Sequence, residues 1–106
     1  MMFRRGRFHD LVTRQLDVFE SDESALLREA GEADAAWSNA DADETEELYG
    51  DYQLVVDAIG ERLHDVREAY ASSLGDETAD VYRTAFDKAA RKRFGRYAAF
   101  LEEEEG

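Results

Sequence analysis

Hydrophobic residues recur every three or four positions along most of this chain, with polar residues between them. This spacing places apolar side chains on one face of an α-helix. The first series begins at Phe8 and predicts a helix over about 7–38. Its members are Phe8, Val12, Leu16, Phe19, Leu26, Ala30, Ala33 and Trp37.

Two further series of the same kind predict helices over about 43–73 and 77–101. Gly95 lies inside the last series, but the apolar spacing continues across it without a change of phase. We therefore expect the third helix to pass through this glycine, at a cost of about 1 kcal/mol relative to alanine. The two series consist of Tyr49, Tyr52, Val56, Ile59, Leu63, Val66 and Tyr70, and of Ala79, Tyr82, Phe86, Ala89 or Ala90, Phe94, Tyr97 and Leu101.

Three helices of similar length with short turns between them predict one all-α domain over 1–106, an elongated antiparallel three-helix bundle. The absence of proline agrees with long, uninterrupted helices. The last residues, 102–106, are expected to form a disordered acidic tail. The outline resembles a spectrin-type repeat in architecture, and that resemblance implies nothing about function.

The charge of the chain is strongly negative overall but unevenly distributed. There are 26 acidic residues against 13 basic ones, which gives a net charge of −13. The basic residues gather in 1–14 and 83–96, whereas the segment between them is acidic. In an antiparallel bundle, the basic end of the third helix would lie beside the acidic turn that joins the first two helices. The basic N-terminus would lie beside 76–80, so opposite charges would meet at both ends and favour this topology.

The composition also excludes several classes of chemistry. There is no cysteine, which excludes disulfides, thiolate metal sites and thiol catalysis. No apolar run has the length of a membrane span, and the basic start, 1–7, lacks the apolar segment of a secretory signal. We therefore expect a cytoplasmic protein. The excess of acidic residues and the scarcity of lysine are typical of GC-rich or halophilic prokaryotes.

Glu61 and His64 form a Glu-x-x-His motif, the spacing with which ferritin-like helices present a carboxylate and an imidazole to one metal. A di-iron centre needs the motif twice, so a homodimer would have to supply the second copy, with Glu29 or Glu32 completing the site. Such a dimer would resemble the small two-helix encapsulated ferritins. The apolar phase of the second helix directs Glu61 and His64 to solvent instead, so we expect no metal site.

Glu23 is the one polar residue in the first apolar series. A lone carboxylate is costly to bury and, where it is buried, is typical of an active-site acid. In the alternative interpretations, the first helix bends or breaks near Ser21 and Asp22, or Glu23 reaches the surface or pairs with Arg67. We favour these alternatives because no nucleophile is placed to join Glu23.

The basic clusters and three aromatic residues are candidate interaction sites. Arginines at the start of a helix oppose its dipole, so the N-terminal cluster is a candidate for contact with RNA or another phosphate backbone. Aromatic side chains that the bundle cannot bury would mark a surface for a partner or for self-association. The candidates are Arg4, Arg5, Arg7, Arg91, Lys92, Arg93 and Arg96, together with Trp37, Tyr49 and Tyr52.

These observations favour a non-catalytic helical module of a cytoplasmic prokaryotic protein. Its role would be protein–protein interaction or assembly, by self-association or by docking on a protein partner. The sequence has no glycine-rich phosphate loop and no catalytic triad, so we expect no enzymatic activity and no cofactor. The alternative is a nucleic-acid or ribosome-associated factor that uses the two basic clusters, which the net charge disfavours. The third hypothesis is the ferritin-like metal-binding dimer.

Overall fold

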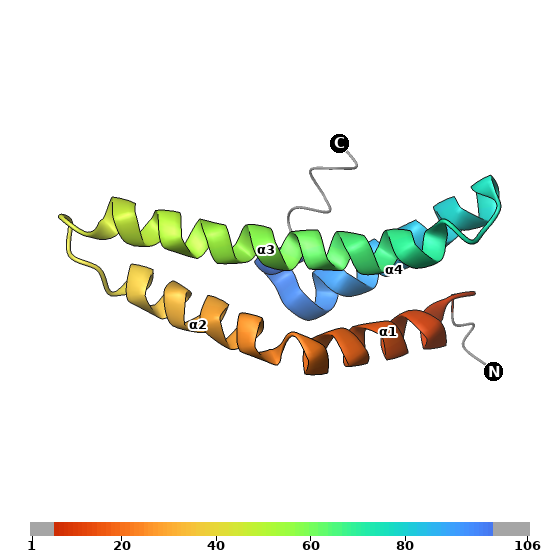
Figure 1. Ribbon diagram of the computed structural model, residues 1–106, viewed down its shortest axis with the longest axis horizontal. Coiled ribbons are helices and arrows are strands. Elements are labelled where there is room, and N and C mark those ends of the chain that lie inside the picture. The colour runs from red at the N-terminus through yellow and green to blue at the C-terminus, as the bar shows by residue number, and fades with distance from the viewer. Residues whose placement is uncertain (1–5, 99–106) are drawn as a thin grey trace, which may run out of the picture.

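The computed structural model describes residues 6–98, apart from the side chain of Arg96. Within this range the chain is helical, and no strand occurs (Figure 1). The all-α prediction is confirmed, whereas the prediction of three helices is wrong. The elements are α1 (His9–Asp22), α2 (Ser24–Ser38), α3 (Thr45–Ala71) and α4 (Asp76–Phe94), followed by a short 3-10 helix, η1 (Gly95–Ala98).

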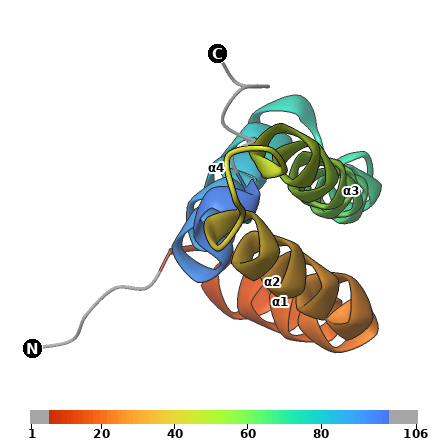
Figure 2. The ribbon, with the colours of Figure 1, turned by 90° about the vertical axis from the view of Figure 1, so that its left-hand side faces the viewer.

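α1 and α2 follow one another almost end to end and form a single long arm (Figure 1). α3 runs back along this arm in the opposite direction. α4 then returns along α3 but ends near its middle, so it accompanies α1 and not α2 (Figures 1 and 2). Three helices therefore pack together at one end of the molecule and two at the other. The overall dimensions are 53 × 30 × 24 Å.

The predicted first helix, 7–38, is interrupted at Glu23, where the backbone angles φ −108° and ψ 27° depart from helical values. The N–H of Glu23 still donates to the carbonyl oxygen of Phe19, at 2.8 Å, so the arm bends rather than separates. Asp22 and Ser24 flank the interruption. Serine and aspartate favour helix ends because their side chains compete for backbone hydrogen bonds.

The prediction of a third helix that continues to 101 is wrong, because α4 stops at Phe94. Gly95 has φ +58°, which residues with a side chain rarely adopt, and its N–H donates to the carbonyl oxygen of Arg91. Glycine in this conformation ends a helix even where the apolar spacing continues. The rest of the predicted helix, 99–101, and the predicted tail, 102–106, lie outside the described residues.

The predicted second helix, 43–73, corresponds to the slightly shorter α3. No side chain caps its first turn. The backbone carbonyl of Asp41 instead accepts hydrogen bonds from the N–H of Thr45, at 3.0 Å, and from its hydroxyl, at 2.8 Å. A backbone turn therefore begins this helix.

The hydrophobic core lies where α1, α3 and α4 meet. Phe8 packs edge-to-face on Tyr82, and Phe19 packs edge-to-face on Phe94, with ring centroids 5.4 and 5.5 Å apart. Both contacts join the arm to α4. In contrast, the only described residue of α2 that is buried is Ala30. The largest fully buried apolar side chains are Leu16, Ile59, Leu63, Tyr82 and Phe86.

Replacement of Gly95 by alanine should destabilise the protein by about 1 kcal/mol, because alanine is strained at positive φ. Gly31, inside α2, is the matched control, since an added methyl group meets nothing within 4 Å at either position. Gly31→Ala should stabilise the fold by about 0.5–1 kcal/mol through helix propensity. Urea unfolding measures both. Equal effects of the two substitutions would show that Gly95 does not end α4.

Candidate docking groove

α1 and α3 face each other on the side of the bundle opposite α4 (Figure 2). Side chains of both helices line a hollow between them. This hollow, the α1–α3 hollow, has a volume of about 330 Å³. Apolar side chains of both helices line it, and Val18 of α1 is 53% exposed. The lining residues from α1 are Leu11, Arg14, Gln15, Val18, Phe19 and Asp22. They are joined by Glu23, which follows α1, and by Val66 of α3.

A second hollow lies between α2 and α3 and has a volume of about 430 Å³. Val55 in this α2–α3 hollow and Val66 in the first one are three helical turns apart, so they lie on the same face of α3. We call the two hollows together the front groove. Leu54, at its edge, is the most exposed of the large apolar residues described, at 70%. The α2–α3 hollow is lined by Glu29, Glu32, Ala33, Asp51, Leu54 and Val55.

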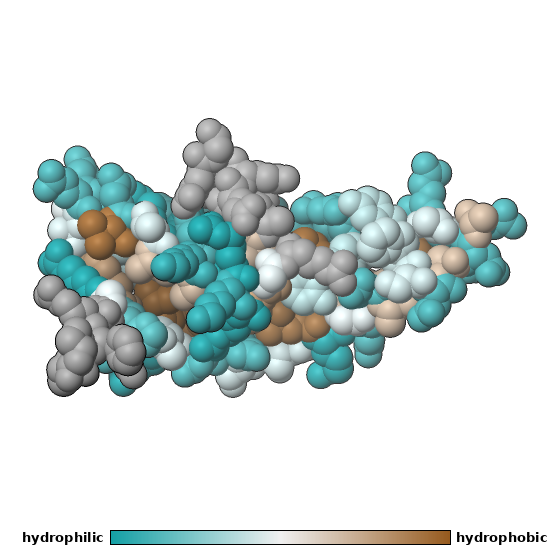
Figure 3. Space-filling view, turned by 180° about the vertical axis from the view of Figure 1, so that it is seen from behind, coloured by the Kyte–Doolittle hydropathy of each residue, from teal (hydrophilic) through white to brown (hydrophobic). Residues whose placement is uncertain are grey.

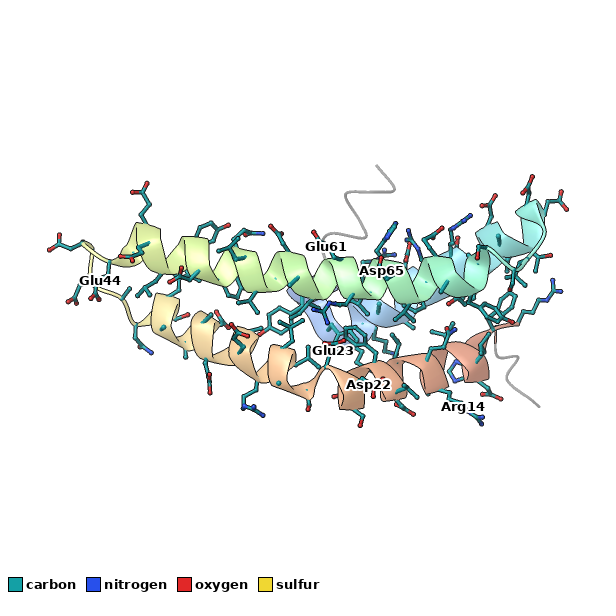
Figure 4. All side chains as sticks on the ribbon, viewed as in Figure 1. Arg14, Asp22, Glu23, Glu44, Glu61 and Asp65 are labelled. Carbon is teal, nitrogen blue, oxygen red and sulfur yellow. The ribbon has the colours of Figure 1, made fainter. Side chains whose placement is uncertain are left out.

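Carboxylates dominate the charge of the front groove. Among the described residues that line it, five are acidic and only Arg14 is basic. Figure 4, viewed from the side of the groove, shows a further exposed acid, Asp65, on α3 next to Val66. The surface therefore combines apolar side chains with a negative rim.

Glu23 lines the α1–α3 hollow at the end nearest α2. Its carboxylate accepts two hydrogen bonds from Nη1 of Arg62 on α3, both at 3.0 Å. The Glu23 side chain is 24% exposed, and it lies where the arm bends toward α3 (Figure 4). The predicted break near Ser21 and Asp22 is thus confirmed, whereas the predicted pair with Arg67 is wrong, because Glu23 binds Arg62.

Arg67 instead enters the core and binds Asp87 of α4. Nη1 of Arg67 lies 2.9 and 3.0 Å from the two carboxylate oxygens of Asp87, whose side chain is completely buried. Nε of Arg67 also donates to Glu68, at 2.8 Å. The sequence pattern did not predict this pair. Asp87 follows Phe86 by one position, about 100° around the helix, so the apolar series of α4 does not mark it as buried.

Glu68 and Arg83 extend this ion-pair network toward the surface of α3 and α4. Arg83 donates to both Glu68 oxygens, at 2.9 Å each. These bonds and the nearby charge of Arg67 lower the pKa of Glu68 to about 2, against the opposing effect of burial. On the other side of α4, Tyr82 donates to Gln15 at 2.8 Å, and burial raises the pKa of this phenol to about 12.

The Glu-x-x-His motif does not form a metal site within the described part of one chain. Glu61 is exposed, and Nδ1 of His64 lies 3.8 Å from the carboxylate of Asp65. No described group of three or more His, Asp or Glu side chains is arranged to hold a metal ion. Glu29 and Glu32, the proposed completing ligands, line the α2–α3 hollow with Asp51 instead.

The basic cluster of α4 does not face the acidic turn at 41–47, and that prediction is wrong. α4 ends halfway along α3, and Arg93 binds Asp17 and Glu20 of α1 at 2.8 and 3.2 Å. Arg91 is half-buried, and Lys92 is exposed beside a smaller hollow between α1 and α4. Figure 3 shows this side of the molecule, where hydrophilic and hydrophobic residues both reach the surface.

Most of the N-terminal basic cluster lies outside the residues that the structure describes. Arg4 and Arg5 are not among the described residues, nor is the side chain of Arg96. The Arg7 guanidinium lies over the ring of Phe8, 5.6 Å from its centroid. Since Phe8 packs on Tyr82, the start of the arm lies beside the first turns of α4, as the charge pattern indicated.

The three candidate aromatic residues form one cluster at the two-helix end. Trp37 lies 4.9 Å from Tyr49 and 5.5 Å from Tyr52, measured between ring centroids. Tyr52 is buried, Trp37 is half-buried and Tyr49 is 44% exposed. The cluster therefore closes the α2–α3 hairpin and leaves part of Tyr49 at the surface.

Comparisons with protein-family models, with curated proteins and with solved structures find no match to this chain. Among the helices of residues 6–98, none combines the length and apolar character needed to cross a membrane.

Glu68→Gln should destabilise the protein by about 1–2 kcal/mol at pH 7, after allowance for partial exposure. The folded pKa of Glu68, about 2, lies below its ordinary value of 4.5, so the carboxylate contributes stability above about pH 4.5. That contribution is lost as the pH falls toward 2. The difference between Glu68→Gln and wild type should therefore shrink from pH 7 to pH 3 in urea unfolding. Glu61→Gln, at an exposed position of the same helix, is the control and should show little change at either pH.

Proposed function

We propose that this protein is a non-catalytic helical interaction module that binds a protein partner through the front groove. The observation that carries the proposal is that α4 covers only one side of the α1–α3 pair. The opposite side keeps apolar side chains at the surface, Val18 at 53% and Leu54 at 70% exposure. A helix placed in the groove would bury them much as α4 buries the other side.

The groove differs from a scatter of single exposed residues, which needs no explanation. Val55 and Val66 lie on one face of α3, and Val18 of the arm lines the α1–α3 hollow together with Val66. Exposed apolar surface with a polar rim is typical of protein interaction sites. The described lining residues include no serine, cysteine or histidine, which is consistent with docking rather than covalent or acid–base catalysis by such groups.

The basic residues of α4 support the nucleic-acid alternative less well. Arg93 is already bound by two carboxylates of α1. Arg67 and Arg83 are bound within the ion-pair network. Arg83 and Arg93 of α4 thus bind carboxylates of neighbouring helices, whereas the apolar side chains Val18 and Leu54 of the front groove are exposed.

Val18→Asp should abolish partner binding, because a carboxylate in the groove must lose its water when the partner docks. Val81→Asp is a matched control: Val81 is 48% exposed on α4, outside the groove, and the substitution changes the charge equally. Tagged wild-type and variant proteins are incubated with lysate of the native host, and retained proteins are compared. Light scattering after size-exclusion chromatography measures self-association of the same samples.

The proposal predicts a partner, or an oligomer, that wild type and Val81→Asp retain and Val18→Asp loses. Leu54→Asp tests the α2–α3 hollow in the same way, and circular dichroism checks that each variant is folded. A set of bound proteins that is identical for all variants, with no change in oligomeric state, would falsify the proposal.

A further inference from the structure

We propose that the occupant of the front groove is a positively charged amphipathic helix of another protein. The inference rests on the proposed function and adds the chemistry of the partner. Three features of the described residues support it: the shape of the groove, the sign of its charge, and the ion pair that divides it.

The groove has the shape that a helix requires. It lies between two long antiparallel elements, the arm and α3, on the side opposite α4 (Figure 2). The lining residues of α3 extend from Asp51 to Val66, which is about 22 Å of helix. A partner helix of about 15 residues has this length, and helices dock in such grooves through one apolar face.

The negative charge of the groove favours a partner with positive charge. Asp22, Glu29, Glu32 and Asp51 line the two hollows, and the fifth acid, Glu23, is bound by Arg62. Basic residues flanking the apolar face of a partner helix would meet these carboxylates. Such complementarity speeds encounter and suppresses wrong partners.

The same carboxylates argue against a second copy of this chain as the occupant. Two grooves placed face to face would bring like charges together in a contact between molecules of net charge −13 each. Like-charge contacts at an interface cost several kcal/mol. A cationic helix from another protein avoids this repulsion.

The pair of Glu23 and Arg62 indicates how the partner places its apolar residues. It crosses the groove between the two hollows, and its arginine is 54% exposed. Apolar side chains of the partner therefore fit on either side of it, in contact with Val18 and Val66 in one hollow and Leu54 and Val55 in the other. The two anchors would lie about three helical turns apart, with a small or polar residue between them.

Synthetic peptides test this chemistry directly. The first probe is a fluorescein-labelled 18-residue peptide with leucine on one helical face and lysine elsewhere. The second has the same composition in an order that is not amphipathic, and the third has glutamate in place of lysine. Fluorescence anisotropy at physiological salt should show the first peptide binding wild type at least about tenfold more tightly than either of the others, since it alone matches both the apolar face and the charge.

The matched substitutions separate groove binding from general attraction to an acidic protein. Val18→Asp and Leu54→Asp should each weaken binding of the first peptide by about tenfold, the loss expected when one apolar side chain of this size is no longer buried. Val81→Asp adds the same negative charge away from the groove and should leave binding equal or slightly tighter. Equal affinities of Val18→Asp and Val81→Asp would overturn the inference.

The remaining outcomes distinguish the inference from the proposed function. If the lysine peptide fails to bind, or the glutamate peptide binds equally well, while Val18→Asp still removes a native partner, the groove is a docking site but its partner is not a cationic helix. A wild-type dimer that Val18→Asp dissociates would replace the cationic helix by a second copy. If neither native binding nor peptide binding depends on Val18 or Leu54, both proposals fail.

Discussion

The buried ion pair between Arg67 of α3 and Asp87 of α4 is the constraint on which the rest of the structure depends. Asp87 is completely buried, so its charge requires a partner, and Arg67 supplies two hydrogen bonds. Removal of either member would leave an unpaired charge in the core, which is far costlier than loss of a surface ion pair. The pair thereby sets which face of α3 receives α4, and Glu68 with Arg83 extends the same contact to the surface.

The position and length of α4 account for the open side of the molecule. The ion pair holds α4 on one side of α3, and Gly95 ends the helix near the middle of α3. α1 is therefore covered from one side only, and α2 packs on α3 without a third helix. The exposed Val18 and Leu54 are consequences of this arrangement. Because Val18 and Leu54 are both exposed on the side opposite α4, this side of the fold is the one proposed to bind a partner.

Charge contributes differently in the interior and at the surface of this protein. In the core Arg67 binds Asp87 of α4, and at the surface Arg93 binds carboxylates of α1, so both arginines join distant parts of the chain. At the front groove the acidic residues outnumber the basic ones. Among the lining acids, Glu23 forms an ion pair with Arg62. The lining of the front groove thus combines a net negative charge with apolar side chains. A partner that matches both features needs cations beside apolar residues.

The sequence by itself determined the helical class, the approximate extent of α3, and the residues that form the core of the three-helix end. These depend on local spacing, because helix periodicity decides which side chains share a face. The tertiary structure alone decided the partners of Arg67, Arg93 and Glu23 and the opening of the groove. These depend on which distant residues meet and on where Gly95 turns the chain, and no local pattern contains the relative position of two helices.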